Sequence, residues 1–503
     1  MRVLLVRPPV PPHAIGLKHI MICEPLELEY VAAGLDRHEV KIFDMILERD
    51  LQRVLRAFEP DVVGTSCYIT GVNEVKKICR TVKLWRRDCW TVVGGVQASQ
   101  APEDFADPAI DCIVRGDGTT VMSELMDAFA DGRPLDEIPG LALPDGDDGV
   151  VRTAERGYMS DPDRLPFPRR DLVGHLQHRY YYLFHQPVAT MKTTWGCWYR
   201  CNFCYTWRIT DGVAYSRSPE SIADELARIE AEDVYIVDDI FFANRRRLTE
   251  LAAILRRRGI QKKYLCYSRA DFVADNEDVI AEWAGLGLKA VFIGLEAPTD
   301  EELDSMEKGC TVDSNRRAIA VLRRNGVDTY GSLITQPDYS AADWQRLWRF
   351  IDETGLYYLN ISPLTPQPGT LIWEKHREEV VVPREAHGLW DFTHVLLPTA
   401  MPLKKYYRAL LRTYARTCLD IRRANRLTLR TRPPVWSRKY LRLWLGALKI
   451  FLQFINAHRH HSPRQLRRAS YRGPEVPGLV PRWKRHARPA APALDVTTGV
   501  RSS

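Results

Sequence analysis

The chain has 503 residues, which is too long for one hydrophobic core and predicts two or three domains. Hydrophobic residues make up 45% and charged residues 27%, as in an ordinary globular protein. The net charge of +7 hides an asymmetry, because residues 404–503 carry 24 Lys and Arg against three acids, while the residues before them are net acidic. Such a basic region favours an anionic surface, either lipid headgroups or nucleic acid.

Three features argue against a secreted or membrane-spanning protein. The 11 cysteines are odd in number and irregularly scattered, which disfavours a disulfide framework. Residues 1–9 lack the apolar core and cleavage site of a secretory signal. No apolar run reaches 18 residues without a charge, so a spanning helix is not expected. We therefore expect a cytoplasmic protein, and the basic region leaves open a peripheral position on the inner membrane surface.

Residues 1–137 are predicted to form a doubly wound α/β domain. Short apolar runs typical of buried parallel strands alternate with helical stretches such as residues 74–86. The runs lie at residues 2–6, 40–43, 61–65, 90–93 and 112–114. Ligands of such sheets bind beyond the carboxyl ends of the strands, where small and polar residues gather in this chain. These residues are Ser66, Thr70, Gly94, Gly95, Gln97, Ser99, Gly116, Asp117 and Gly118. Glycines there let a large ligand approach the backbone, although many α/β proteins turn on Gly-Gly with nothing bound.

Residues 138–188 are interpreted as a connector without assigned chemistry. A turn at residues 145–149 lies between apolar pairs and predicts a small hairpin. Pro166 and Pro168 predict an extended crossing to the next domain, which covers residues 189–400.

Three cysteines that follow a predicted strand at residues 189–194 are the strongest signal in the chain. Cys197, Cys201 and Cys204 are spaced by four and three, so one tight loop presents three thiolates to a single metal centre. A structural zinc site requires four protein ligands, whereas a cubane iron–sulfur cluster held by three cysteines leaves one iron open for chemistry. No fourth Cys or His follows at a zinc-finger interval. Three unrelated core cysteines, or an incomplete zinc site, remain the alternative.

Residues 189–400 are predicted to form a second α/β domain. Helices are expected at residues 219–230 and 246–257, and further strands at residues 234–237, 264–267, 290–293, 327–333 and 358–361. About six such units are too few for a closed eight-stranded barrel, and in barrels of parallel strands the active site lies at the carboxyl ends. The residues after these strands are either binding residues or solvated strand ends. They are Asp238, Asp239, Ser268, Arg269 and Glu296.

The C-x-x-x-C-x-x-C pattern, with Phe203 directly before its last cysteine, resembles the signature of radical S-adenosylmethionine (SAM) enzymes. With the glycine loops upstream, the order resembles the cobalamin-dependent members of that family over most of residues 1–375. The resemblance implies an open (β/α)6 barrel and three cofactors, namely a [4Fe–4S] cluster on the three cysteines, SAM, and cobalamin on the strand ends of residues 1–137. It implies SAM-binding roles for Phe203, Asp238, Asp239, Ser268, Arg269 and Glu296, and corrinoid contacts for the nine strand-end residues of the first domain.

The sequence departs from the family at three points. Asp117 stands where the family often has Glu, and Gln97 where it often has His. The D-x-H-x-x-G motif, which supplies an axial histidine in many cobalamin proteins, is absent, so cobalamin is expected to bind without that ligand. His13 is interpreted as a loop histidine.

The chemistry implied by the resemblance is radical methyl transfer. The cluster would cleave SAM to a 5′-deoxyadenosyl radical that takes hydrogen from an unactivated carbon, and methylcobalamin would donate the methyl group. Two SAM molecules would be used per turnover, and an external flavodoxin or ferredoxin would supply electrons.

Residues 401–472 are predicted to be helical and basic. Residues 439–455 are apolar and aromatic except for a narrow stripe of Arg442, Gly446, Lys449 and Gln453 at helical spacing. A membrane-interfacial helix and a helix packed on the barrel both fit this pattern. Residues 473–503, rich in Pro, Ala and basic residues, are predicted to be disordered.

The domain order and residues 395–403 are most similar to hopanoid C-3 methylases, which implies a small-molecule or lipid substrate, such as a hopanoid ring. Three alternatives remain. They are a non-methylating cobalamin radical SAM enzyme such as an anaerobic porphyrin ring cyclase, an RNA-modifying methylthiotransferase, and an iron–sulfur or cobalamin sensor without catalysis. The second is disfavoured, and nucleic acid is not an expected partner, because the sequence has neither a second three-cysteine cluster nor an appended RNA-binding barrel.

Overall fold

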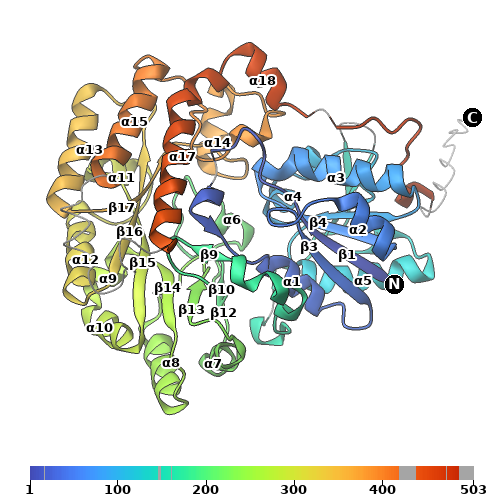
Figure 1. Cartoon of the computed structure of the whole chain (residues 1–503), viewed down its shortest axis with the longest axis horizontal. Coiled ribbons are helices and arrows are strands. Elements are labelled where there is room, and N and C mark those ends of the chain that lie inside the picture. The colour runs from blue at the N-terminus through green and yellow to red at the C-terminus, as the bar shows by residue number, and fades with distance from the viewer. Residues whose placement is uncertain (16, 146–148, 160, 419–437, 472, 486–503) are drawn as a thin grey trace, which may run out of the picture.

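The computed structural model describes residues 1–15, 17–145, 149–159, 161–418, 438–471 and 473–485. Two mainly parallel sheets lie side by side, each covered by helices, with the N-terminal sheet in blue and the second sheet in green to yellow (Figure 1). The C-terminal helices pack on the side of the second sheet (Figure 1). This arrangement confirms the predicted α/β class.

The N-terminal sheet has the strand order β3-β1-β4-β5-β6-β7-β8. Its first five strands are parallel, and β7 and β8 form an antiparallel hairpin at its edge. The strands are β1 (Arg2–Arg7), β3 (Glu39–Asp44), β4 (Val62–Ser66), β5 (Trp90–Gly94), β6 (Cys112–Val114), β7 (Leu141–Pro144) and β8 (Val150–Arg152). The helices are α1 (Leu26–Ala33), α2 (Leu51–Phe58), α3 (Val72–Trp85), α4 (Val96–Gln100) and α5 (Gly118–Asp131). The hairpin expected in the connector therefore extends this sheet.

Both faces of the N-terminal sheet are buried, as its continuous apolar runs predict. On β1, Val3 and Leu5 pack with residues of α1 and α5, whereas Leu4 and Val6 pack with residues of α2 and α3. Because successive side chains of a strand point to opposite faces, helices are needed on both sides. This packing leaves the carboxyl ends of the strands free for ligands.

The second sheet contains six parallel strands in the sequential order β10-β13-β14-β15-β16-β17. They are β10 (Val188–Met191), β13 (Asp233–Ile236), β14 (Lys263–Arg269), β15 (Leu288–Glu296), β16 (Asp328–Thr335) and β17 (Tyr358–Pro363). The helices are α6 (Thr206–Ile209), α7 (Pro219–Arg228), α8 (Arg245–Arg257), α9 (Ala270–Asp275), α10 (Glu277–Leu286), α11 (Asp300–Ser305), α12 (Val312–Arg324), α13 (Ala341–Thr354) and α14 (Leu371–His376). The pair β11 (Thr194–Trp195) and β12 (Tyr215–Ser216) lies beside the cysteine loop. A sequential parallel sheet with two free edges is the predicted half-barrel.

Aromatic side chains fill the inside of the half-barrel. The rings of Tyr235 and Tyr267 are 5.7 Å apart, and those of Tyr330 and Tyr358 are 4.7 Å apart. Tyr182, from a short strand outside this sheet, lies 4.7 Å from Tyr235 and 5.8 Å from Tyr330 and so joins the two groups. The interior is a packed core, and ligands are expected at the carboxyl ends of the strands.

Three helices follow the barrel, α15 (Leu403–Cys418), α17 (Arg438–His460) and α18 (Pro463–Ala469). Helix α17 packs against α15 and against η1 (Leu17–His19), a short 3-10 helix. Of the region predicted to be helical, residues 419–437 and 472 lie outside the described residues. Among the helices of the described chain, none combines the length and apolar character that a bilayer-crossing helix needs.

Residues 473–485, part of the segment expected to be disordered, contact the N-terminal domain. Arg482 N donates to Asp111 Oδ1 at 2.6 Å, and Trp483 Nε1 donates to Pro144 O at 2.9 Å. The disorder expected of residues 486–503 concerns positions outside the described residues.

Histidines join the end of α17 to the segment that follows the barrel. His394 Nε2 lies 2.8 Å from His460 Nδ1, and the Tyr407 hydroxyl lies 3.0 Å from His461 Nε2. The His13 ring stands edge-on to His460 with the centroids 6.0 Å apart, so this loop histidine contacts the C-terminal helix. Burial, with His394 as the second cause, lowers the pKa of His460 to about 4 and that of His461 to about 3.

These histidines predict a loss of stability in mild acid. Both stay neutral in the folded protein, whereas the unfolded chain takes up protons below about pH 6.5. Their contribution is therefore complete above about pH 6.5 and declines as the pH falls toward the lowered values. Allowing for partial exposure, we expect the free energy of unfolding in urea to fall by about 1–3 kcal/mol between about pH 7.5 and 5.5.

Two variants test this assignment. His461→Gln removes one titrating group and should lose less stability over that pH range than the unmodified protein. The exposed His178 serves as the control, and His178→Gln should show the unmodified pH dependence. An identical pH dependence in the His461 variant would contradict the assignment.

Candidate active site

Cys197, Cys201 and Cys204 lie in one tight loop between β11 and α6. Cys204 N donates to Cys201 O at 3.1 Å, and Trp207 Nε1 donates to the same oxygen at 3.0 Å. The middle cysteine is therefore held by both the end of the loop and the helix that follows it.

The same loop is attached to two later strand ends. Asn202 N donates to Met306 O at 3.1 Å, and its side-chain amide donates to Ser305 O at 2.8 Å, both in the segment that follows β15. Ile372 N, beyond β17, donates to Asn202 O at 3.1 Å. The barrel thus fixes the position of the thiols.

The three thiols fit a cluster rather than a single ion. Burial raises the pKa of Cys197 to about 11, and Cys204 and Cys201 add to the rise because neighbouring thiolates repel one another. In the described part of the chain, no three His, Cys, Asp or Glu side chains lie close enough together to chelate one metal ion. A cubane suits three thiols in one loop, because each cysteine binds a different iron and one iron stays open.

Two of the predicted SAM-binding side chains are engaged with the backbone. Asp238 is buried and accepts hydrogen bonds from the backbone N–H groups of Thr193 and Thr194, the latter at 3.0 Å. Burial raises the pKa of Asp238. Ser268 is also buried, and its hydroxyl donates to Arg269 O at 3.0 Å. Both residues hold the strand-end loops in place.

Asp239 lies beside the thiols. Its Oδ2 accepts from Gly196 N at 2.8 Å and from Lys192 Nζ at 3.1 Å. Its negative charge adds to the rise in the pKa of both Cys197 and Cys204.

Arg269 approaches the cluster loop through Cys201. The guanidinium is buried, pairs with Asp271 at 2.9 Å and donates to Lys308 O at 2.7 Å. It lies 3.6 Å over the ring of Tyr199, and its Nη1 is 3.9 Å from Cys201 Sγ. The cluster loop therefore has a fixed positive charge beside its middle cysteine.

Glu296 forms a buried ion pair with Lys308 at 2.7 Å. Gly294 makes room for it, since a Cβ there would lie 2.1 Å from Glu296 Oε1 and 2.8 Å from Lys308 Nζ. Burial acts to lower the pKa of Lys308, but Glu296 and Cys201 raise it, so the ammonium lies within electrostatic reach of the cluster loop. Phe203 packs under this ammonium, which is 5.9 Å from its ring.

The nine candidate corrinoid residues all lie at the carboxyl edge of the N-terminal sheet. Ser66 ends β4, Thr70 lies in η2 (Ile69–Gly71), Gly94 ends β5 with Gly95 next, Gln97 and Ser99 lie in α4, and Gly116, Asp117 and Gly118 lead into α5. Gly116 has φ +86°, and no atom lies within 4 Å of the place a Cβ would take. A bare backbone surface of this kind fits the close approach of a flat corrin ring.

Three of the nine are engaged within the fold. The buried Gln97 donates through Nε2 to Asp104 Oδ2 at 2.6 Å, and Asp104 also pairs with Arg384 of the segment after the barrel. Ser99 Oγ accepts from Gly116 N at 2.9 Å, and Asp117 caps the N-terminus of α5. These side chains shape the loops and leave the glycines as the exposed surface.

The carboxyl edges of the two sheets meet at Tyr68. This residue follows β4, and 65% of it is exposed. Yet burial raises its pKa, Glu27 and Asp239 raise it further, and Lys192 opposes them. Tyr68 is therefore an accessible side chain that lies among charges of both domains. Tyr205, next to the last cysteine, has its pKa raised by burial and by Tyr68.

Sequence reasoning missed four residues of this site, Tyr68, Lys192, Tyr199 and Lys308. Tyr199 lies inside the cysteine loop and Lys192 is a lone charge just before it, so both carried a signal. Lys308 stands in the K-G-C-T stretch after Glu296. Tyr68 belongs to no pattern, because it is defined only by the meeting of two domains.

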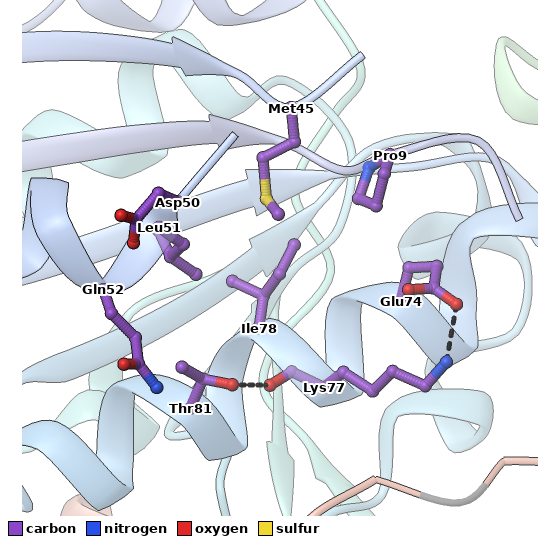
Figure 2. A pocket seen from close by; sticks show the side chains of 9 residues that line it. All are labelled: Pro9, Met45, Asp50, Leu51, Gln52, Glu74, Lys77, Ile78 and Thr81. Atoms are coloured by element: carbon purple, nitrogen blue, oxygen red, sulfur yellow. Dashed lines mark hydrogen bonds and ion pairs between the residues drawn. The ribbon is translucent and has the colours of Figure 1, made fainter. Parts of the chain in front are cut away.

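A separate pocket in the N-terminal domain contains none of the candidate residues. It has a volume of about 220 Å³ and lies between α2 and α3. Figure 2 shows Met45 and Ile78 pointing toward each other across it, with the Lys77–Glu74 ion pair of 2.7 Å at one side. The pocket adds nothing to the site at the strand ends.

Gly196 provides a first test of the cysteine loop. It has φ +88°, and a Cβ there would lie 2.2 Å from Val213 O and 2.5 Å from Thr210 Oγ1. Gly196→Ala should therefore displace the loop and lower the iron bound per chain after anaerobic reconstitution by about tenfold or more. Gly212→Ala is the matched control, because Gly212 also has a positive φ, +75°, but nothing within 4 Å. Equal iron loss in both variants would mean that backbone strain, not collision, is responsible.

Comparison with known proteins identifies both domains. Residues 12–126 match the B12 binding domain, and residues 191–351 match the Radical SAM superfamily. The chain is 32% identical over 400 residues to the hopanoid C-3 methylase of Methylococcus capsulatus. The aligned region covers 78% of this chain and 75% of that protein. It is 24% identical over 504 residues to the anaerobic magnesium-protoporphyrin IX monomethyl ester cyclase of Rubrivivax gelatinosus, which covers 95% of this chain and 87% of that protein.

A solved structure with a similar fold is the cobalamin-dependent S-adenosylmethionine radical enzyme OxsB with aqua-cobalamin and S-adenosylmethionine bound. The TM-score is 0.67 at 16% identity, over 90% of this chain and 72% of that chain. This similarity confirms the predicted architecture. The matches to the Radical SAM superfamily and the B12 binding domain confirm the three predicted cofactors, a [4Fe–4S] cluster, SAM and cobalamin. Because both domains are matched and one relative is 32% identical over three quarters of its length, the chain belongs to the cobalamin-dependent radical SAM methyltransferase family.

Proposed function

We propose that this protein adds a methyl group to an unactivated carbon of a lipid-soluble substrate, with a hopanoid ring as the leading candidate. The similarity to the hopanoid C-3 methylase carries the proposal. The proposal includes two SAM molecules per turnover, an external flavodoxin- or ferredoxin-type electron donor, and peripheral membrane contact through the basic C-terminal region.

When bound, the cluster and SAM would supply the radical chemistry and cobalamin the methyl group. The residues of the chain hold and orient these groups. Cys197, Cys201 and Cys204 would ligate the cluster. Arg269 and Lys308 place positive charge beside Cys201.

The other candidates receive roles from their surroundings. Asp239 carries negative charge near the thiols and would attract the SAM amino group, whereas Glu296 would act through its ion pair with Lys308. Phe203 packs against apolar residues beyond β15 and β17 and would border the cofactor. Asp238 and Ser268 would act as positioning residues, because their side chains hydrogen-bond to the backbone.

The space around Tyr68 is the proposed substrate site. A carbon that receives a methyl group from cobalamin after losing hydrogen to a radical must lie between the two cofactors. Tyr68 and Tyr205 approach this space from the corrinoid edge and the cysteine loop, respectively. Aromatic walls suit an apolar ring system.

Labelled SAM tests the proposal. Anaerobically reconstituted and reduced protein is incubated with a hopanoid and SAM that carries a deuterated methyl group, and the products are measured by mass spectrometry. We expect one labelled methyl group per product, with one 5′-deoxyadenosine and one S-adenosylhomocysteine formed. Formation of 5′-deoxyadenosine without a methylated hopanoid would reject the substrate.

The alignment with the Rubrivivax gelatinosus cyclase over 95% of this chain favours one alternative, an oxidative ring closure without methyl transfer. The same labelled SAM separates the two functions. A cyclase would form 5′-deoxyadenosine with its porphyrin substrate and leave the product free of deuterium.

A further inference from the structure

One apolar side of α17 is exposed to solvent, while another packs into the barrel core. Six large side chains on this helix are between 42% and 56% exposed, namely Leu441, Trp444, Leu445, Leu448, Leu452 and Ile455. Their spacing places them along one side of the helix over about 21 Å. They are six of the fourteen exposed large apolar residues in the described part of the chain, so this stripe is unlike the rest of the surface. The buried Phe454 and Ala457 lie on the opposite side.

The polar stripe of the same helix faces the protein. Arg442 donates through Nη2 to Leu183 O at 2.9 Å, and its guanidinium lies 3.8 Å over the ring of Tyr181. Gly446 touches η1, where a Cβ would come within 2.0 Å of His19 O. These contacts fix the rotation of α17 about its axis. The leucines and the tryptophan must therefore point outward.

A cationic surface cavity adjoins the apolar stripe where α17 meets η1. Its volume is about 320 Å³, and no carboxylate lines it. Its lining includes four cationic side chains, those of Lys18, Arg438, Arg442 and Lys449. Leu441 and Leu445 belong both to this lining and to the exposed stripe. The surface thus places positive charge directly beside exposed apolar side chains. This arrangement is complementary to a phospholipid, in which a negative phosphate adjoins acyl chains.

We propose that α17 docks the protein on a bilayer that contains anionic phospholipid. The leucine and tryptophan stripe enters the interfacial region, and the cationic cavity receives a headgroup phosphate. The proposal rests on the proposed function, in which the substrate is lipid-soluble, and it names the surface and the lipid class of the membrane contact. A second copy of the chain is a poorer partner, because pairing two identical helices brings like-charged cavities together.

Vesicle flotation of the anaerobically reconstituted holoprotein tests the stripe. We expect binding to vesicles of phosphatidylcholine with phosphatidylglycerol, weak binding to phosphatidylcholine alone, and a decline with added salt. Leu448→Glu combined with Leu452→Glu should abolish flotation. The matched control is Leu84→Glu with Val151→Glu, which makes the same change at exposed apolar positions of the N-terminal domain and should leave flotation intact.

The cavity is tested by removing two of its cations. Each base near an anionic leaflet strengthens binding by about fivefold, so Lys18→Gln with Lys449→Gln should weaken binding by about 25-fold. Lys41→Gln with Lys375→Gln removes the same charge at exposed positions elsewhere and should leave binding nearly unchanged. Equal weakening by both pairs would overturn the headgroup site.

Other outcomes are equally decisive. Absence of flotation, or equal binding to both vesicle types, would overturn the proposal. If the unmodified protein does not bind vesicles, and light scattering gives a lower mass for the Leu448 and Leu452 variant than for the unmodified protein, the stripe would instead be assigned to a second copy of the chain. Formation of 5′-deoxyadenosine from SAM verifies that each variant is an intact holoenzyme. Methyl transfer to detergent-dispersed substrate without vesicle binding rejects the docking alone, and vesicle binding without methyl transfer rejects the proposed function alone.

Discussion

Replacing Cys201 with alanine is expected to remove both bound iron and SAM cleavage. Only three cysteines lie in the loop, so the loss of one leaves two ligands for a cubane. Cys201 is the most buried of the three, and its backbone oxygen accepts bonds from Cys204 and Trp207. No neighbouring thiol therefore takes its place. We expect formation of 5′-deoxyadenosine to fall by more than about 10³-fold, because the rate acceleration depends on the cofactor.

Cys310 is the matched control for this variant. It is half-buried and lies near Arg269 and Lys308, but it is outside the cysteine loop. Cys310→Ala should retain iron and SAM cleavage. A Cys201→Ala protein that held a full cluster by iron and sulfide analysis and by its optical spectrum would refute the assignment of the loop.

Replacing Glu296 with glutamine is expected to cause a large loss of stability. The change leaves the Lys308 ammonium buried without its carboxylate partner at 2.7 Å. Breaking a buried pair from one side costs about 3–5 kcal/mol, because the remaining charge is neither solvated nor paired. Urea unfolding of the protein should therefore show a lower midpoint with little change in slope.

An exposed ion pair provides the control. Arg316 and Glu353 are 2.7 Å apart, with 45% and 51% of their side chains exposed. Glu353→Gln should change the free energy of unfolding by less than about 1 kcal/mol. The double variant Glu296→Gln with Lys308→Met should recover part of the loss, since no charge is left buried. A loss as small in Glu296→Gln as in Glu353→Gln would show that water reaches the pair.

Local sequence patterns were sufficient for the fold and the cluster loop. Continuous apolar runs such as residues 2–6 predicted strands that are buried on both faces, and β1 has one set of helices on each face. The spacing of Cys197, Cys201 and Cys204 predicted a single loop, because residues three and four apart share one turn of chain. Both features depend on residues that are close in sequence.

The side of α17 that faces the protein was not predictable from its pattern. An apolar helix with a polar stripe normally exposes the stripe, yet here Arg442 and Gly446 contact the protein as well as the apolar Phe454 and Ala457. The reason lies in the surface that α17 packs against. The backbone of η1 at His19 approaches Gly446 closely, and the carbonyl oxygen of Leu183 accepts a hydrogen bond from Arg442. Periodicity describes the two sides of a helix but not the surface that receives it.

The sequence by itself determined the two α/β domains, the three-cysteine loop and the edge of each sheet where the candidate binding residues gather. Only the tertiary structure decided which strand-end side chains are available there. Asp238 is engaged by the backbone at Thr193, Gln97 turns toward Asp104, and Glu296 is paired with Lys308, while Tyr68 lies among charges of both domains. The physical reason is that secondary structure follows from neighbouring residues, whereas the partner of a buried polar group is set by the packing of segments that are distant in the chain.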